Sequence, residues 1–227
     1  MNILALDTAT EELSLCLAAG GQTSIWILRA GLKHSQTLLP GIQALLREAG
    51  ITAAELQLIV CSLGPGSFTG IRIGLAAAKG LAFGCGCPLV GASTLDALAY
   101  RFASFPGVVV PVMSSLRKMH YSALYREGKR ISAYLDLSLT ELAQKLAGFK
   151  QALLTGPQAG GLFKQLPREA TFQVFLDSDP SATNPQALLE LGRRSYLELG
   201  AGEAELKPLY LRQSEAKIMS RGDQSGI

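Results

Sequence analysis

The stretch that decides the fold is "SLGPGSFTGIRIGLAAAKGLAFG", residues 62–84. It opens with glycines and a proline and continues as a long run of small and aliphatic side chains. An apolar run of strand length, 56–63, leads into it, so the sequence predicts a turn between a buried strand and a helix that begins near Thr69. Backbone amides at such a helix start can bind an anion. A phosphate-binding loop is therefore one interpretation of this turn.

The glycine spacing disfavours the two common nucleotide-binding motifs. A Walker A loop ends in Gly-Lys-Ser/Thr, but Ile71 follows Gly70 here. A dinucleotide-binding fingerprint requires Gly-x-Gly-x-x-Gly, and the spacing of Gly64, Gly66 and Gly70 is one residue too long. A dinucleotide-binding protein is therefore the weakest of the functional interpretations.

Composition indicates a compact globular protein without a membrane role. The chain has 227 residues, of which 48% are hydrophobic and 17% charged, and its net charge of +3 does not by itself indicate nucleic acid. Its four cysteines fit neither a disulfide framework nor a zinc site. The start, "MNILALDTAT", lacks the basic region of a signal peptide. We expect a cytoplasmic protein.

The same order of elements is predicted twice along the chain. In the first half we expect strands and helices in the order β-β-β-α-β-α-β-α, at residues 1–7, 12–19, 23–29, 38–49, 56–63, 69–84, 88–92 and 94–104. Ser35 or Thr37 is expected to cap the first of these helices. In the second half we expect β-β-β-α-β-α-β-α at residues 107–113, 119–127, 130–137, 139–148, 152–156, 158–165, 171–176 and 185–199.

This repetition of a meander and crossovers predicts an α/β protein of the actin-like architecture, with two ribonuclease H-like lobes, each a β-β-β-α-β-α unit. We expect the first lobe at residues 1–105 and the second lobe, with a C-terminal segment, at 106–227. The C-terminal segment is too apolar at Leu206, Leu209, Tyr210 and Leu211 to be free throughout, so we expect it to dock on a lobe.

The helix of the quoted stretch is more apolar than a surface helix needs to be. Arg72 and Lys79 are its only charged residues, and Gly70, Gly74 and Ala78 line up on one side. Each interior glycine costs about 1 kcal/mol relative to alanine, which suggests a packing reason. The pattern predicts that a partner protein covers this helix in addition to its own sheet. The alternative is coverage by the neighbouring helix or by the C-terminal segment.

Several segments together resemble the bacterial TsaB (YeaZ) family. They are "ILALDTATEELSLCL" (3–17), "KHSQTLLPGIQALLREAG" (33–50), "GPGSFTGIRIG" (64–74) and "PLYLR" (208–212). The resemblance covers most of residues 3–100 and is weaker from 107 to 200. It implies the actin-like (ASKHA) fold and a role in making N6-threonylcarbamoyladenosine at position 37 of tRNAs that read ANN codons.

In that family the protein is a non-catalytic scaffold. It pairs with the catalytic TsaD subunit or with itself, and a small ATPase, TsaE, completes the assembly. The resemblance implies that helices of the first lobe make the contact, with interface residues His34, Leu38, Ile42, Gly70, Ile71, Arg72, Gly74, Leu75 and Ala78. We expect a charged residue in place of Gly74 to abolish pairing without unfolding the chain. For His34, a metal ligand and a helix cap remain alternatives to an interface residue.

The residues themselves favour a subunit without catalytic or metal-binding residues of its own. Thr94 and Leu98 stand where the catalytic relative has two histidines, and neither side chain supplies an imidazole nitrogen to a metal. Ser114 stands where the family usually has an aspartate. We therefore expect no bound cofactor, with ATP or ADP and Mg²⁺ entering only at the level of the complex.

The alternative function is a small-molecule kinase of the actin-like ATPase class. In that case Asp7 would anchor Mg²⁺, and Thr8 and Thr10 would assist in binding a nucleotide. The turn lacks the glycine that such kinases use, so a strand-end turn held by side-chain-to-backbone hydrogen bonds is the competing interpretation. Five basic residues are expected on one hairpin, where they either contact tRNA phosphates or face solvent: Arg117, Lys118, Arg126, Lys129 and Arg130. We expect tRNA contact to be mainly indirect.

Overall fold

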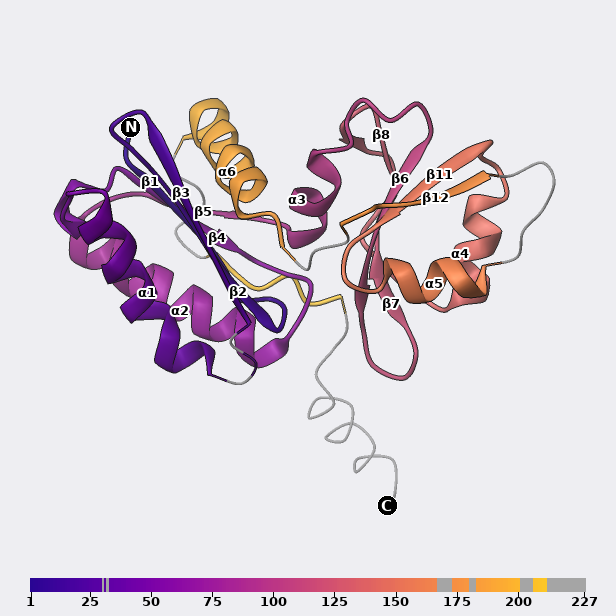
Figure 1. The fold of residues 1–227 in the computed structure, drawn as a ribbon, viewed down its shortest axis with the longest axis horizontal. Coiled ribbons are helices and arrows are strands. Elements are labelled where there is room, and N and C mark those ends of the chain that lie inside the picture. The colour runs from indigo at the N-terminus through magenta and orange to yellow at the C-terminus, as the bar shows by residue number, and fades with distance from the viewer. Residues whose placement is uncertain (30, 32, 167–172, 180–182, 201–205, 212–227) are drawn as a thin grey trace, which may run out of the picture.

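The structure is a computed structural model that describes residues 1–29, 31, 33–166, 173–179, 183–200 and 206–211. It has two lobes, each built on a mixed sheet with helices against it (Figure 1). The described part of the chain contains no helix with the length and apolarity that a membrane span requires.

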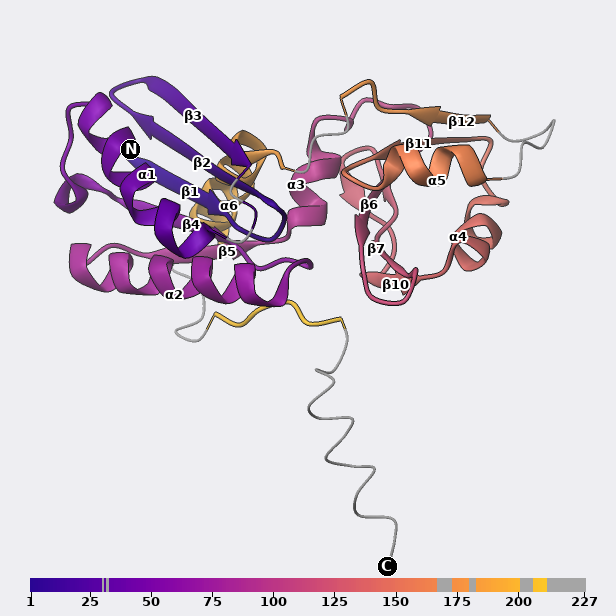
Figure 2. The same ribbon diagram turned by 60° about the horizontal axis from the view of Figure 1, so that its bottom comes forward.

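The first lobe is a five-stranded sheet with helices on both faces. Its strand order is β3 (Gln22–Arg29), β2 (Glu12–Ala19), β1 (Ile3–Asp7), β4 (Leu58–Ser62) and β5 (Leu89–Ala92). β1, β4 and β5 are parallel, and β1 to β3 form an antiparallel meander. Helices α1 (His34–Glu48) and α2 (Phe68–Cys85) cover one face, and a short 3-10 helix (Ala53–Glu55) precedes β4. Figure 2 shows β3 at the outer edge of this sheet.

The second lobe has a sheet in the order β10 (Leu135–Leu137), β7 (His120–Ser122), β6 (Val108–Ser114), β11 (Gln151–Thr155) and β12 (Gln173–Leu176). Helices α4 (Leu139–Leu146) and α5 (Ala159–Gln165) pack on one face around a valine- and leucine-rich core. A small hairpin of β8 (Tyr125–Arg126) and β9 (Lys129–Arg130) pairs with the start of β6.

The two long strands expected in the second lobe are interrupted. The strand expected at 119–127 is divided at residues 123–124, although β7 and β8 pair with β6 in one antiparallel register, and the strand expected at 130–137 is divided at residues 131–134 between β9 and β10. In the first half of the chain, the helix expected at 94–104 is shorter, with α3 spanning Thr94–Tyr100. The strand expected from residue 171 is described only from Gln173 onward.

Helix α6 (Pro185–Leu199) returns from the second lobe to the first. Its buried residues Ala187, Leu188 and Leu189 pack against Ile3 and Val60 on the face of the first sheet opposite α1 and α2. The order of elements along the chain predicts that α6 belongs to the second lobe, because the division between the lobes is expected at residue 105. In the structure α6 instead covers the sheet of the first lobe. The division at residue 105 itself stays a prediction.

The helix starts follow local capping chemistry. Ser67 caps α2 by accepting a hydrogen bond from the Gly70 amide at 3.2 Å. The cap expected for α1 at Ser35 or Thr37 is wrong, because the helix already begins at His34, and the Thr37 hydroxyl instead donates to the Lys33 carbonyl at 3.0 Å.

Candidate functional site

The glycine-rich loop before α2 packs against the turn that follows β1. A Cβ atom on Gly66 would lie 2.2 Å from the carbonyl oxygen of Ala9. The Ser67 amide donates to that same oxygen at 2.7 Å. The close approach of two chain segments therefore explains the glycine at position 66, and the Ser67 amide is already engaged within the chain.

The turn after β1 contains the three candidate nucleotide-binding residues. The Asp7 carboxylate accepts a hydrogen bond from the Ala9 amide at 2.8 Å, and the Thr8 hydroxyl donates to the Gly70 carbonyl at 2.7 Å. Thr10 exchanges hydrogen bonds with the backbone of Glu12, both at 3.1 Å. All three side chains thus hold the turn together, as the structural interpretation predicted. Nucleotide binding at these residues stays a prediction.

The environment of Asp7 favours its neutral form. Asp7 is buried at the end of β1, and burial raises the pKa of its carboxyl group above the usual value. Hydrogen bonds from the Ala9 amide and from the hydroxyls of Ser62 and Thr94 act in the opposite direction, as does the nearby charge of His34. His34 is itself buried, and its Nε2 atom has no hydrogen-bond partner among the described residues.

The positions that match the histidines of the catalytic relative have structural roles. The Thr94 hydroxyl lies 2.5 Å from that of Ser62, and Leu98 is buried in the cluster that joins the lobes. Among the residues that the structure describes, no group of three or more His, Cys, Asp or Glu side chains is arranged to hold a metal ion. Ser114, at the end of β6, is exposed.

The small-residue stripe of α2 faces the chain's own sheet. A Cβ atom on Gly70 would lie 2.0 Å from the Thr8 carbonyl oxygen, and one on Gly74 would lie 2.2 Å from the Thr8 hydroxyl. Ala78 continues the stripe and is fully buried. Close approach to the β1 turn is therefore the packing reason for these glycines. Coverage of α2 by a partner protein in addition to its own sheet stays a prediction.

The other predicted interface residues are mostly buried as well. Of the nine, only Arg72 is exposed, and the buried ones within the first-lobe core or under α1 and α2 are His34, Leu38, Ile42, Gly70, Ile71, Gly74, Leu75 and Ala78. The eight buried residues therefore have almost no side-chain surface that a partner could contact directly. Their role in positioning the helices of an interface remains a prediction.

The outward side of α2 carries a second small-residue stripe that sequence reasoning missed. We define the α2 outer face by its exposed residues Ala76, Lys79, Gly80, Phe83 and Gly84. Phe83 is 93% exposed, and a Cβ atom on Gly80 or Gly84 would meet no atom of the residues that the structure describes within 4 Å. Ala76, Gly80 and Gly84 repeat every four residues, the same signal that singled out the inward stripe.

The C-terminal segment docks along the first turns of α2, as its apolar residues predicted (Figure 2). The Leu209 amide donates to the Leu63 carbonyl at 2.8 Å. The Tyr210 hydroxyl accepts from Arg72 Nε at 2.9 Å, and its ring lies 5.3 Å from that of Phe68. The C-terminal segment therefore covers the N-terminal part of α2, as one of the alternatives predicted. The α2 outer face lies nearer the C-terminal end of the same helix.

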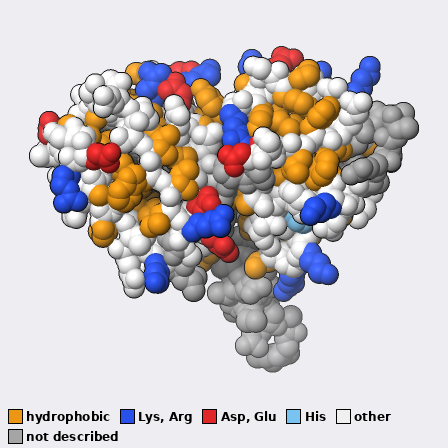
Figure 3. Space-filling view, viewed as in Figure 1, with side chains coloured by type: hydrophobic (Ala, Val, Ile, Leu, Met, Phe, Trp, Pro, Cys, Tyr) orange, Lys and Arg blue, Asp and Glu red, His pale blue; other side chains and the backbone are white. Residues whose placement is uncertain are grey.

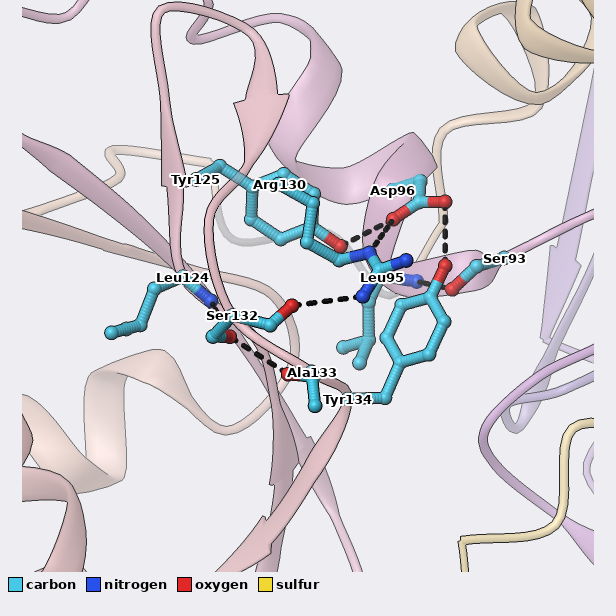
Figure 4. A network of polar contacts seen from close by, with 9 residues as sticks. All are labelled: Ser93, Leu95, Asp96, Leu124, Tyr125, Arg130, Ser132, Ala133 and Tyr134. Atoms are coloured by element: carbon cyan, nitrogen blue, oxygen red, sulfur yellow. Dashed lines mark hydrogen bonds and ion pairs between the residues drawn. The ribbon is translucent and has the colours of Figure 1, made fainter.

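Helix α3 connects the two lobes through a carboxylate network (Figure 4). The Asp96 carboxylate accepts hydrogen bonds from the hydroxyls of Tyr125 at 2.5 Å and Tyr134 at 2.7 Å, and Arg130 Nε lies 3.8 Å from it. Burial, together with the Asp96 charge, raises the pKa of Tyr134 to about 12. Both tyrosines therefore stay protonated and act as donors across the lobe junction.

The five basic residues of the second lobe do not form one patch, which corrects that expectation. Arg117 and Lys118 lie in the β6–β7 connection, beyond the pair Ser114 and His120. The other three lie on β8 and β9, which pair with β6 at Val109, near its opposite end. Arg130 is also engaged by Asp96 and by the Ser132 carbonyl at 2.8 Å.

The two lobes, their sheet orders and the position of the β1 turn define an actin-like ATPase fold, as the sequence predicted. YeaZ from Pseudomonas aeruginosa has the same fold with a TM-score of 0.77 and 26% identity, covering 92% of this chain and 99% of that one. A Bacteroides thetaiotaomicron protein with an actin-like ATPase fold and unknown function shares only 9% identity at a TM-score of 0.50, over 83% of this chain and 95% of that one.

Comparison of the sequence with known proteins identifies the family within the actin-like ATPase fold. The family profile described as "TsaD: tRNA N6-adenosine threonylcarbamoyltransferase" matches residues 29–177. The tRNA threonylcarbamoyladenosine biosynthesis protein TsaB of Escherichia coli is 29% identical, covering 95% of this chain and 96% of its own length. TsaB of Haemophilus influenzae is 28% identical, over 93% and 94%. The chain belongs to this family, in its TsaB (YeaZ) branch.

Proposed function

We propose that this chain is a non-catalytic subunit of the machinery that makes threonylcarbamoyladenosine in tRNA, and that it activates a TsaD-type catalytic subunit by pairing with it. The full-length similarity to proteins named for tRNA threonylcarbamoyladenosine biosynthesis supports the pathway. The family profile, which is described for the transferase itself, supports a relationship to the catalytic subunit. Neither comparison supports the alternative of a small-molecule kinase.

The α2 outer face is the observation that supports pairing. Phe83 is 93% exposed, so its ring contributes little to the stability of the isolated chain. Gly80 has open space around it among the described residues, so the cost of a glycine inside a helix, about 1 kcal/mol relative to alanine, has no compensating contact in that part of the chain. A second helix that lies close across Gly80 and buries Phe83 would supply both contacts, and aromatic side chains of this kind dominate many interfaces.

The residues at positions 94 and 98 support the proposed division of labour in the complex. Thr94 and Leu98 contribute a hydrogen bond and packing where a metal-binding relative needs imidazoles. We infer that the TsaD-type partner supplies the catalytic metal and most of the tRNA contact. A TsaE-type ATPase, ATP or ADP and Mg²⁺ would then act on the assembled complex, in the cytoplasm.

The pairing is tested by mixing the purified chain with the TsaD-type subunit of the same organism and measuring mass by light scattering after gel filtration. We expect a stable mixed species that a Phe83→Glu variant fails to form. Leu116→Glu is the matched control, because Leu116 is also an exposed apolar residue, at 54%, but lies in the β6–β7 connection of the second lobe. Reconstituted tRNA modification, with the TsaE-type ATPase and ATP present, should follow the same order of variants.

The possible outcomes test the proposed pairing role and the proposed contact surface separately. If the wild-type chain and the TsaD-type subunit elute apart even with the ATPase and ATP present, the proposed role is wrong. If Phe83→Glu pairs as well as the wild type, the role stands but the α2 outer face is the wrong surface. A charged residue at Gly74 cannot make this distinction, because its side chain would collide with Thr8 inside the first lobe.

A further inference from the structure

Two of the four cysteines lie next to each other at the C-terminal end of α2. Cys85 is the last residue of this helix, and Cys87 follows it after one glycine. Both are half-buried free thiols, whereas Cys16 and Cys61 are fully buried in the first sheet. Cys85 and Cys87 are therefore the thiols that a reagent in solution reaches.

The turn at Gly86 brings these two thiols together. Gly86 has left-handed backbone with a φ of 65°, which favours glycine. Its amide donates to the Phe83 carbonyl at 3.4 Å, and the Cys87 amide donates to the Ala82 carbonyl at 3.2 Å, so the chain folds back on the last turn of α2. The side chains of Cys85 and Cys87 then hydrogen-bond with each other.

The spacing of the pair suits a disulfide bond. Disulfides join Cα atoms that are usually about 4.4–6.8 Å apart. Residues i and i+2 are at most about 7 Å apart even in an extended chain, and the turn at Gly86 shortens this separation. A bond between Cys85 and Cys87 would therefore involve only the end of the helix and leave its earlier turns in place.

The surroundings of Cys85 leave room for a bulky reagent. Gly84 and Gly86 flank it, both are exposed, and a Cβ atom on either would meet no atom of the described residues within 4 Å. Charged side chains of both signs are spread over both lobes on the face shown in Figure 3, whereas the sequence around the pair has no charged residue from 80 to 95. Since no cation adjoins the pair in the sequence to stabilise a thiolate, the pair suits exchange with a disulfide better than fast reaction with a peroxide.

The two members of the pair differ in how they are held. Cys87 packs against the core of the first lobe. Burial, the charge of Cys85 and a hydrogen bond with Cys85 raise the pKa of the Cys87 thiol above its usual value, and a backbone hydrogen bond acts in the opposite direction. A charged Cys85 thus keeps Cys87 protonated, so Cys85 attacks first and Cys87 resolves the product.

We propose that Cys85 and Cys87 form a reversible intrachain disulfide by exchange with a small-molecule disulfide, for which oxidised glutathione is the probe. The Cys85 thiolate attacks one sulfur of the probe, which forms a mixed disulfide and releases one glutathione thiolate. Cys87 then loses its proton and attacks the Cys85 sulfur, which releases the second glutathione thiolate. The two protein thiols are oxidised, the probe is reduced, and its two thiolates take up the two protons.

The position of the bond makes it reversible. Exposed disulfides are more easily reduced than buried structural ones, and closing so short a loop constrains the unfolded chain little. Disulfides of this labile kind are the ones found in reducing compartments, where they are usually transient. The bond would form in the isolated chain, so it does not depend on the proposed function.

The other two cysteines serve as controls within the same chain. Burial raises the pKa of the Cys16 thiol to about 11. Burial also raises the pKa of the Cys61 thiol, with the Asp7 charge acting in the same direction, and its Sγ donates to the Ser62 carbonyl at 3.4 Å. Buried thiols of this kind are unreactive, so both should stay reduced in the folded chain.

The test is to incubate the folded full chain with oxidised glutathione and a metal chelator, block free thiols with N-ethylmaleimide, and measure intact and peptide masses. We expect the loss of two hydrogens, a link between Cys85 and Cys87, and recovery of both thiols with excess reduced glutathione. Cys87→Ser should stop at the mixed disulfide on Cys85. Cys85→Ser should react at least about tenfold more slowly than the wild type, because Cys87 is the less accessible thiol.

A second measurement needs no variant and keeps the test decisive if a serine variant does not fold. Phenylarsine oxide condenses with two adjacent thiols and releases water, so one equivalent should protect both Cys85 and Cys87 of the wild type from N-ethylmaleimide. A chain that ends with two bound glutathiones, or with a disulfide to another chain, overturns the inference. Failure of the arsenical to protect both thiols also overturns it, because the pair would then be too far apart to bond.

Discussion

Replacing Gly74 by alanine should destabilise the chain, although alanine is the better helix former. The gain in helix propensity is about 1 kcal/mol. Against it, the new methyl group would lie 2.2 Å from the Thr8 hydroxyl and 3.3 Å from the Leu6 side chain. Overpacking of this kind costs about 1–3 kcal/mol. Movement of Thr8 also breaks its hydrogen bond to the Gly70 carbonyl, which adds about 1 kcal/mol.

The balance predicts a net loss of about 1–3 kcal/mol, which lowers Tm by about 5 °C in a chain of this length. Gly80→Ala is the matched control in the same helix, because a Cβ atom there meets nothing within 4 Å in the described part of the chain. That change should raise Tm by about 2 °C. Differential scanning calorimetry or thermal circular dichroism of the two variants measures the difference directly.

A third variant identifies Thr8 as the cause. Thr8→Ala alone loses the hydrogen bond to Gly70, but combined with Gly74→Ala it also removes the hydroxyl that collides with the new methyl group. The double variant should therefore be more stable than the sum of the two single changes predicts. If Gly74→Ala is as stable as Gly80→Ala, the inward stripe does not pack as described and the argument from close approach is wrong.

Three further changes test the lobe junction, the β1 turn and the docked segment. Asp96→Asn leaves one of the two tyrosine hydroxyls, of Tyr125 or Tyr134, without its acceptor and should destabilise by about 1–3 kcal/mol in urea unfolding, whereas Tyr134→Phe should cost less. Asp7→Asn should stabilise the chain at neutral pH, because burial raises the pKa of Asp7 and disfavours its charged form. The contribution of Asp7 to the stability of the wild type is full below pH 3.8 and is lost as the pH rises through the raised pKa. The advantage of the variant should therefore shrink toward pH 4. Tyr210→Phe should change the free energy of unfolding by less than about 0.5 kcal/mol, since Tyr210 is 45% exposed.

Periodicity and turn residues were sufficient to predict most of the first lobe. β1 to β3, α1, β4 and α2 fall within a few residues of their expected ranges, because each has a clear apolar pattern bounded by glycine, serine or proline. The second lobe was less predictable. The strands expected at 119–127 and 130–137 are each interrupted, although β7 and β8 pair with β6 in one register, and nothing local in the sequence marks residues 123–124 or 131–134 as the interruptions.

The position of α6 on the first sheet also depends on long-range contacts that the local sequence does not show. The sequence predicted the helix at 185–199, and in the structure Asn184 caps it by accepting from the Ala187 amide at 3.1 Å. Which sheet it covers depends on space at Gly192, where a Cβ atom would lie 2.3 Å from the Val60 side chain of the first sheet. A contact between residues so far apart in the chain leaves no signal in the local pattern.

The same limit explains why the sequence could not show that the stripe of Gly70, Gly74 and Ala78 faces the chain's own sheet. Gly70, Gly74 and Ala78 repeat every four residues, and so do Ala76, Gly80 and Gly84, so the helix has two small-residue stripes of equal strength in the sequence. Periodicity says which residues share a side of a helix, but the neighbours decide which side is already occupied. Here Thr8 occupies the first stripe, whereas Cβ atoms on Gly80 and Gly84 of the second stripe would meet no atom of the described residues within 4 Å. Substitutions aimed at a partner therefore belong at Gly80 and Phe83, whereas substitutions at Gly74 report on the folding of the first lobe.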